Sequence, residues 1–179
     1  MKSILAPIIL LTLLFPSLAL GGVRMVIIDD LVERNDIVYE RSNGVPYTGR
    51  SYDENFGGAG LLDFVTYQDG VKHGLRVQNW QKDYGRQLLL KMTYKNGKAH
   101  GPVTRYHSNG NISMKGKFKN GQYDGIVVRY GYSNGTYWQG RYKNGKEHGR
   151  WTSFLKDGSI NRNDRKWNGT WRNGVRVSD

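Results

Sequence analysis

The chain has 179 residues and a net charge of +12, and it contains no cysteine. This length suits one domain of ordinary size, and the lack of cysteine excludes disulfides, thiolate zinc sites and a cysteine nucleophile. The charge is uneven, since residues 23–70 carry 4 basic against 9 acidic side chains and residues 71–179 carry 22 against 6, and so basic a body favours anionic partners.

The first predicted element is a secretory signal peptide over residues 1–21. An apolar run from Ile4 to Phe15 follows a positive start, and small residues precede a cleavage site after Ala19 or Gly21. The run is too short for a membrane span. We therefore expect an exported protein, periplasmic or secreted, and export without disulfides favours a bacterial compartment. Export also argues against nucleic acid as a partner.

The rest of the chain divides at a change in charge and turn content. Residues 22–58 are predicted to form an acidic N-terminal cap with a first degenerate repeat, and residues 59–179 a row of β-hairpins with a C-terminal cap. From residue 96 to residue 158, Asn-Gly or Asp-Gly pairs recur every 10 to 14 residues between short strand-like runs. Asn-Gly is the strongest short hairpin signal, because both central residues of a type I′ turn need φ > 0.

The hairpins repeat with a period of 24 residues. The stretch Lys95–Gly101 (KNGKAHG) returns as Lys119–Gly125 (KNGQYDG) and Lys143–Gly149 (KNGKEHG). One hairpin cannot bury its apolar side in water, but a row of hairpins can. The sequence therefore predicts an all-β fold, an elongated antiparallel meander of tandem hairpin repeats. The positions that define the repeat are Tyr94, Gly97, Gly101, Phe118, Gly121, Gly125, Tyr142, Gly145 and Gly149.

Aromatic residues recur at two positions of the repeat. The first rung is Tyr94, Phe118 and Tyr142, and the second is Tyr106, Tyr130 and Phe154. Because side chains alternate between the faces of a sheet, we expect one face to gather the rings as a core. The step of three between Trp151 and Phe154 leaves two alternatives, a bulge near Gly149 or rings on both faces. Rings of this kind can also stack on sugars or cage a choline group, but a core explains most of them better.

The other face is expected to gather basic side chains. A two-residue turn at Asn96–Gly97 sets Lys95 opposite Lys98, and the same count sets Lys143 opposite Lys146. Two interpretations stay open: lysines that keep turns and edges soluble, or a surface that binds an anionic membrane or envelope polymer. The residues of this candidate anion-binding face are Lys95, Lys98, Lys117, Lys119, Arg141, Lys143 and Lys146.

Two constellations that could carry chemistry fail on geometry. His73, His100 and His148 share a repeat position, but equivalent positions lie about 9.5 Å apart at about 4.8 Å per strand, too far for one metal ion. Gly131–Gly135 fits the Gly-x-Ser-x-Gly pattern of a nucleophile elbow, which needs a helix after it, yet here the pattern overlaps a hairpin turn. We therefore expect no catalytic residue, no metal, no cofactor and no enzyme.

The repeat also resembles a known one. The pattern Tyr-Lys-Asn-Gly-Lys-x-His-Gly, followed by an aromatic residue and a second turn, is similar to the MORN-repeat variant of the YwqK-like family, as are Val45–Gly49 and Gly169–Asp179. The resemblance covers about residues 29–179. It implies a repeat sheet used for protein–protein contact, and the family's toxin–antitoxin label implies a toxin as the unknown partner. We therefore expect a non-enzymatic, antitoxin-like scaffold in the bacterial envelope, with binding of anionic envelope components as the alternative.

Overall fold

The computed structural model describes residues 24–56, 61–82, 85–133 and 135–178. The predicted signal peptide, residues 1–21, lies outside the described residues. Within them the chain is nearly all β-structure, as the turn spacing predicts, with one short 3-10 helix, η1 (Ile28–Asp30). None of the described residues form a helix that has the length and hydropathy to cross a membrane.

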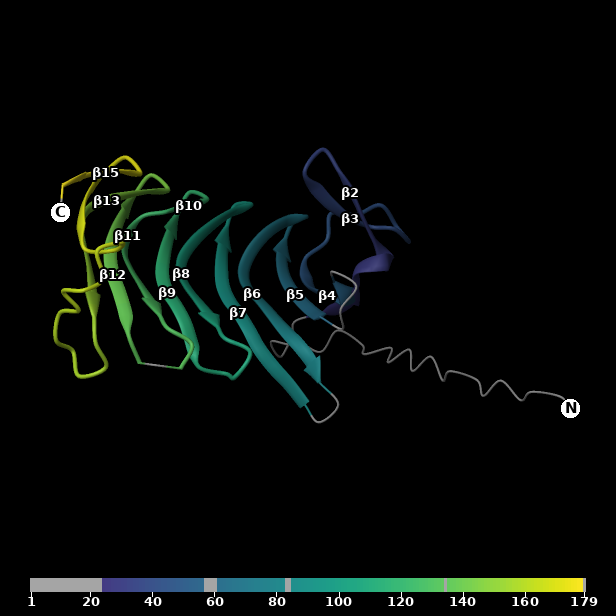
Figure 1. The fold of residues 1–179 in the computed structure, drawn as a ribbon. Helices are drawn as coiled ribbons and strands as arrows, with labels where there is room; N and C mark the ends of the chain where they lie inside the picture. The colour runs from purple at the N-terminus through teal and green to yellow at the C-terminus, as the bar shows by residue number, and fades with distance from the viewer. Residues whose placement is uncertain (1–23, 57–60, 83–84, 134, 179) are drawn as a thin grey trace, which may run out of the picture.

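Consecutive hairpins build one long sheet of 13 strands. From β4 onwards the strands pair antiparallel in chain order, with the short β10 beside β11 on the edge of β9, which confirms the predicted meander. Strand β1 adds to the edge of β4 in parallel, and β2 and β3 form a separate hairpin. That hairpin and β15 lie at opposite ends of the row (Figure 1). The strands are β1 (Met25–Ile27), β2 (Leu31–Arg34), β3 (Ile37–Glu40), β4 (Gly49–Phe56), β5 (Leu61–Gln68), β6 (Val71–Lys82), β7 (Gly85–Lys95), β8 (Lys98–Tyr106), β9 (Ile112–Lys119), β10 (Gln122–Tyr123), β11 (Gly125–Tyr130), β12 (Tyr137–Lys143), β13 (Lys146–Phe154), β14 (Gly169–Arg172) and β15 (Val175–Ser178).

The first glycine of each repeat belongs to a type I′ turn. Asn96 and Gly97 have φ of 50° and 77°, and the same pair of positive angles recurs at the turns of the next two repeats. This geometry suits the right-handed twist of the flanking strands. Lys95 therefore lies opposite Lys98, as predicted.

The second glycine of each repeat marks a bulge, which the sequence raised only near Gly149 and only as one of two alternatives. Between the paired positions Met92–Val103 and Tyr94–Ala99, β8 advances four residues while β7 advances two. Gly101 lies in this stretch with φ of 88°, and the same irregularity recurs between β12 and β13. Glycine adopts this angle without the steric cost of a side chain, and such a bulge bends its strand.

The tips of the hairpins are hydrogen-bonded to one another. In each case the amide of the turn glycine donates to a carbonyl of the preceding hairpin. Because the acceptors occupy equivalent repeat positions, this turn ladder holds successive turns at one fixed spacing. Its bonds run from Gly97 to Lys72 (2.9 Å), Gly121 to Ala99 (2.8 Å), Gly145 to Tyr123 (2.9 Å) and Gly174 to Glu147 (2.9 Å).

The main core lies on one face of the sheet, which we call the inner face. Ring contacts run along it from Phe118 through Tyr123 and Tyr142 to Trp151, with centroid distances of 4.2, 5.5 and 5.6 Å. The first aromatic rung is therefore part of the core, as predicted. The buried members of this core are Met92, Val103, Met114, Val127, Tyr142 and Trp151.

The second aromatic rung lies on the opposite, outer face, so the expectation that one face gathers the rings is wrong. Tyr130 stands three residues after the buried Val127, and Phe154 three residues after Trp151. Because side chains alternate, a step of three changes the face. Tyr137 links the two outer rings and stacks on Phe154 at 4.7 Å. A bulge is present in β13, but it adds two residues and therefore does not change which face the following side chains point to. The step of three between Trp151 and Phe154 is thus explained by rings on both faces of the sheet.

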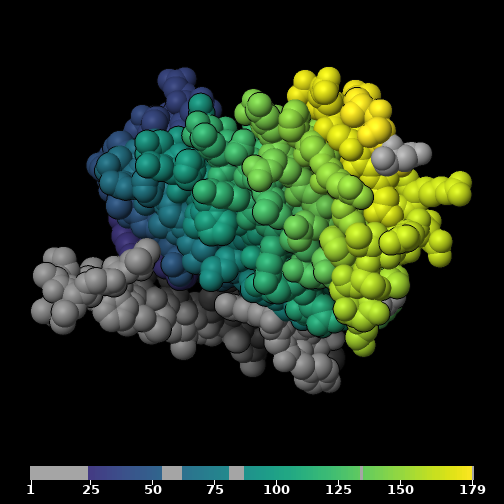
Figure 2. Space-filling view, turned by 90° about the vertical axis from the view of Figure 1, so that its left-hand side faces the viewer, coloured from purple at the N-terminus to yellow at the C-terminus, as the bar shows by residue number. Residues whose placement is uncertain are grey.

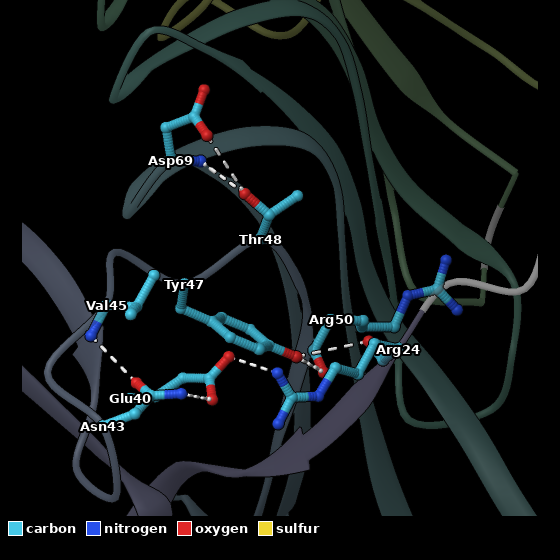
Figure 3. Close-up of polar contacts among 8 residues, drawn as sticks. All are labelled: Arg24, Glu40, Asn43, Val45, Tyr47, Thr48, Arg50 and Asp69. Atoms are coloured by element: carbon cyan, nitrogen blue, oxygen red, sulfur yellow. Dashed lines mark hydrogen bonds and ion pairs between the residues drawn. The ribbon is translucent and has the colours of Figure 1, made fainter. Parts of the chain in front are cut away.

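The N-terminal segment is organised around Tyr47, which is completely buried and belongs to a second core with Val38. Its hydroxyl donates to the carbonyl oxygen of Arg50 at 2.8 Å and lies 3.2 Å from that of Arg24 (Figure 3). The Arg24 guanidinium in turn pairs with Glu40. Tyr47 thus ties the start of β1, the β2–β3 hairpin and β4 together at the first end of the sheet.

Buried tyrosines make the fold sensitive to alkali, and we expect the free energy of unfolding to fall above about pH 10. Burial raises the pKa of Tyr47 to about 12, and burial also raises the pKa of Tyr67. An unfolded tyrosine ionises near pH 10, so this stabilisation is complete below that pH and is lost as the pH rises to about 12. Urea unfolding measured across this pH range should show that the free energy of unfolding falls less for Tyr47→Phe than for the wild type. Tyr132→Phe, a change at an exposed tyrosine, serves as the control. If the free energy of unfolding fell equally with pH in all three proteins, the buried Tyr47 would not be the source of the effect.

Candidate functional site

The seven predicted basic residues all lie on the outer face and are exposed. Lys117 and Lys119 flank the inner-face residue Phe118, and Arg141 and Lys143 flank Tyr142, so alternation directs all four outwards. We call the set the basic strip. Its members are Lys95, Lys98, Lys117, Lys119, Arg141, Lys143 and Lys146.

The turn ladder fixes the spacing of the strip. Lys95, Lys119 and Lys143 each precede the Asn-Gly turn of their own repeat, and the ladder bonds these turns to their neighbours. Equivalent residues therefore recur every two strands, about 9.5 Å apart. The repeats follow one another across the surface in chain order (Figure 2), so the strip extends over three successive repeats.

Within the ranges that the structure describes, no side chain of the strip forms an ion pair; the salt bridges there join Arg24 with Glu40 and Arg76 with Asp63. Asp124, an acidic residue beside the second of these turns, meets Lys117 through the backbone, its amide donating to the lysine carbonyl at 3.0 Å. Lysines directly opposite each other in a sheet destabilise it by a few tenths of a kcal/mol up to about 1 per pair. The strip therefore carries a cost that the fold itself does not offset with carboxylates.

Only basic residues beside the turns were predicted from the sequence, and four more exposed cations of the outer face were missed. Lys91 and Lys115 stand an even number of residues from Lys95 and Lys117 on the same strands, so counting by two away from the turns would have found them. The other two depend on how β13 pairs with β14, which no turn signal predicts. The four are Lys91, Lys115, Arg150 and Arg172.

Arg76 and Arg129, two arginines of the inner face, form side-chain hydrogen bonds there. The Arg76 guanidinium donates to the buried Asp63, from Nε to Oδ1 at 3.0 Å and from Nη2 to Oδ2 at 2.7 Å. Burial disfavours the charged form of Arg76, but these bonds hold its pKa above the ordinary value. Arg129 donates to the Tyr142 hydroxyl at 2.6 Å, which donates to Glu147 at 2.5 Å; burial and then this bond raise the pKa of Tyr142.

The rejected constellations lie where the repeat places them. His73, His100 and His148 stand on β6, β8 and β13, and in the described part of the chain no group of three metal-ligating side chains comes together. Gly131–Gly135 joins β11 to β12, so the chain continues into a strand where a nucleophile elbow needs a helix.

Fold and site together define an all-β repeat sheet that has a packed inner face and a basic outer face. No model of a known protein family matches the chain, and no curated protein matches it. The features of the molecule that bear on function are therefore the strip and the repeat that spaces it.

Proposed function

We propose that the protein is a non-enzymatic scaffold of the bacterial envelope that binds an anionic envelope component, phospholipid or acidic polysaccharide, through the basic strip. The observation that supports this most is a row of seven exposed cations, held at repeat spacing and without ion pairs in the described chain. Lysines that only keep a surface soluble need no fixed register. Here the turn ladder imposes a register on them.

The composition of the strip favours an anionic surface over a tight protein interface. Interfaces that bind proteins tightly are enriched in Trp, Tyr and Arg and depleted in Lys. Six of the seven strip residues are lysine, with Arg141 the exception. The large exposed apolar residue that lies among them is Ile126.

A pair of charge-reversed variants tests the proposal. Lys143→Glu/Lys146→Glu changes the strip, and Arg162→Glu/Arg165→Glu makes the same change in net charge, from +12 to +8, in the loop after β13. Each basic residue near an anionic surface contributes about 1 kcal/mol, so the strip variant should bind anionic vesicles or an acidic polysaccharide at least about tenfold more weakly. The loop variant should stay close to the wild type.

Retention by the wild type should fall steeply between low and physiological ionic strength, because exposed charges are screened by salt. Vesicle sedimentation and retention on an immobilised acidic polysaccharide measure both effects. No retention on either probe at low salt, or equal losses in the two variants, would remove the proposal.

A protein partner is the second candidate, and the open edge of β15 favours it. Among the described strands β15 pairs with β14 alone, and its Val175 and Val177 are exposed. An extended segment of a partner could add to such an edge as a further strand; the antitoxin role, with a toxin as the partner, remains tied to the resemblance. A stoichiometric partner that co-purifies from the native envelope fraction, and is lost in Val175→Glu/Val177→Glu, would support this candidate. A lone monomer would count against it.

A further inference from the structure

The outer face has a second feature, an open groove of about 830 Å³ at the strand ends opposite the turn ladder. Two successive repeats line it, together with the loop after β13. The lining residues that matter below are Tyr106, Tyr130, Tyr132, Lys115, Lys156 and Asn109.

The groove contains rings of the second aromatic rung. Tyr106 and Tyr130 are half-buried on the outer face and occupy equivalent positions of successive repeats. They lie on β8 and β11, with β9 between them. Two strands separate the rings by about 9.5 Å, an interval comparable to the length of a disaccharide. These rings lie outside the main core.

A third ring at the groove is exposed and yet held in place. Tyr132 is 54% exposed, and its ring meets that of His107 edge-on at 5.2 Å. Its hydroxyl lies 3.3 Å from Ser108 Oγ, and Asn109 Nδ2 donates to its carbonyl oxygen at 3.3 Å. A turn of one repeat thus positions a ring of the next, which lowers the entropy cost of binding against it.

The groove is also basic. Lys115 and Lys156 belong to its described lining, and no carboxylate does. The remaining polar groups are amides and hydroxyls, such as Asn109 and Thr136, which can both donate to and accept from sugar hydroxyls.

We propose that this groove binds an acidic polysaccharide. A tyrosine ring offers a flat apolar face to the C–H face of a pyranose and keeps a polar hydroxyl at its edge. A lysine ammonium forms a charge-assisted hydrogen bond with the sugar carboxylate, so the two lysines select acidic over neutral sugars. A choline group, also able to stack on rings, would be repelled by the same lysines.

The groove proposal goes beyond the proposed function and does not rest on it. None of the seven strip residues lines the groove, so either surface can fail without the other. A short oligosaccharide reports on the groove, whereas a long polymer or a vesicle would engage the strip as well.

Calorimetric titration of the full chain with a short oligogalacturonate tests the groove. Lys115→Glu should weaken binding by about tenfold or more, the loss of one charge-assisted hydrogen bond. Arg162→Glu is the control, since Arg162 is an exposed cation in the loop after β13 and lies outside both the strip and the groove; this variant should bind like the wild type. Tyr132→Ala should lose affinity, and Tyr132→Phe should retain most of it.

Comparison ligands decide the class of molecule. A neutral maltooligosaccharide of equal length should bind at least about tenfold more weakly than the oligogalacturonate. A single-stranded oligonucleotide would use the same rings and lysines, so equal or tighter binding of it would overturn the proposal, as would equal competition by inorganic sulfate. No binding of oligogalacturonate, or equal effects of Lys115→Glu and Arg162→Glu, would overturn it too. If Lys115→Glu disturbs folding, Lys115→Gln, which removes the charge without reversing it, tests the same contact, and it should also bind oligogalacturonate more weakly than the wild type.

Discussion

Gly140→Ala should destabilise the protein by about 3 kcal/mol, whereas Gly116→Ala, at the same position of the preceding repeat, should cost about 1 kcal/mol or less. A Cβ on Gly140 would lie 2.0 Å from Cδ2 of Trp151. The nearest atom to a Cβ on Gly116 is Cγ2 of Val127, at 3.1 Å. The two variants make the same chemical change in the same kind of strand, so the difference isolates the space above each glycine.

The indole of Trp151 has little freedom to move aside. Trp151 is completely buried, and the rings of Tyr142 and Trp167 contact it with centroid distances of 5.6 and 5.7 Å. At Gly116, a shift of Val127 by a few tenths of an ångström would make room for the new methyl group. The lower conformational entropy of the unfolded chain with Ala offsets part of the free energy that this shift costs. Urea unfolding followed by circular dichroism measures both variants. Equal decreases in the free energy of unfolding would show that the Trp151 indole does not pack directly against Gly140.

The ion pair between Arg76 and Asp63 should give the second large effect. Arg76→Leu alone should cost about 3–5 kcal/mol, because it leaves a buried carboxylate without its partner. The side chains are 20% and 7% exposed and meet through two hydrogen bonds, and Arg76 also bonds to the Tyr94 hydroxyl at 3.3 Å. The double variant Asp63→Leu/Arg76→Leu should recover much of the loss, since apolar residues of similar volume often replace a buried pair at little cost.

A double-mutant cycle of urea unfolding curves measures the coupling between these two residues. Additive losses, with the double variant as unstable as the sum of the single ones, would mean that the pair contributes little as a pair. Arg34→Leu on the exposed part of β2 is the matched control for removal of an arginine, and it should change the free energy of unfolding by less than about 0.5 kcal/mol.

Local chemistry made the hairpins predictable, whereas contacts between hairpins did not show in the sequence. Asn96 and Gly97 specify a type I′ turn by themselves, and the turn sets the register of Lys95 and Lys98. The bulge at Gly101 and the bond from Gly97 to Lys72 depend on neighbouring strands. No sequence pattern indicated that β1 would pair in parallel with β4.

The two faces of the sheet also differ in how much of them the sequence could predict. The basic strip follows from counting by two beside a turn, so its seven residues could be placed from the sequence. The groove could not, because Tyr106 and Tyr130 have the same residue type and period as the core rings, and only their distance from Val103 and Val127 along the strand reveals the other face. Lys156 reaches the groove from the loop after β13, and no repeat position predicts its place.

The bonds between neighbouring turn tips have a consequence for how such a molecule changes its size. Each hairpin is tied to the one before it and the one after it, so its energetics are close to those of a linear array with nearest-neighbour coupling. Duplication of one whole unit would then lengthen the charged row by one increment and leave the two ends untouched. Reach, and with it avidity for a long polyanion, becomes a property that gene duplication can adjust in discrete steps.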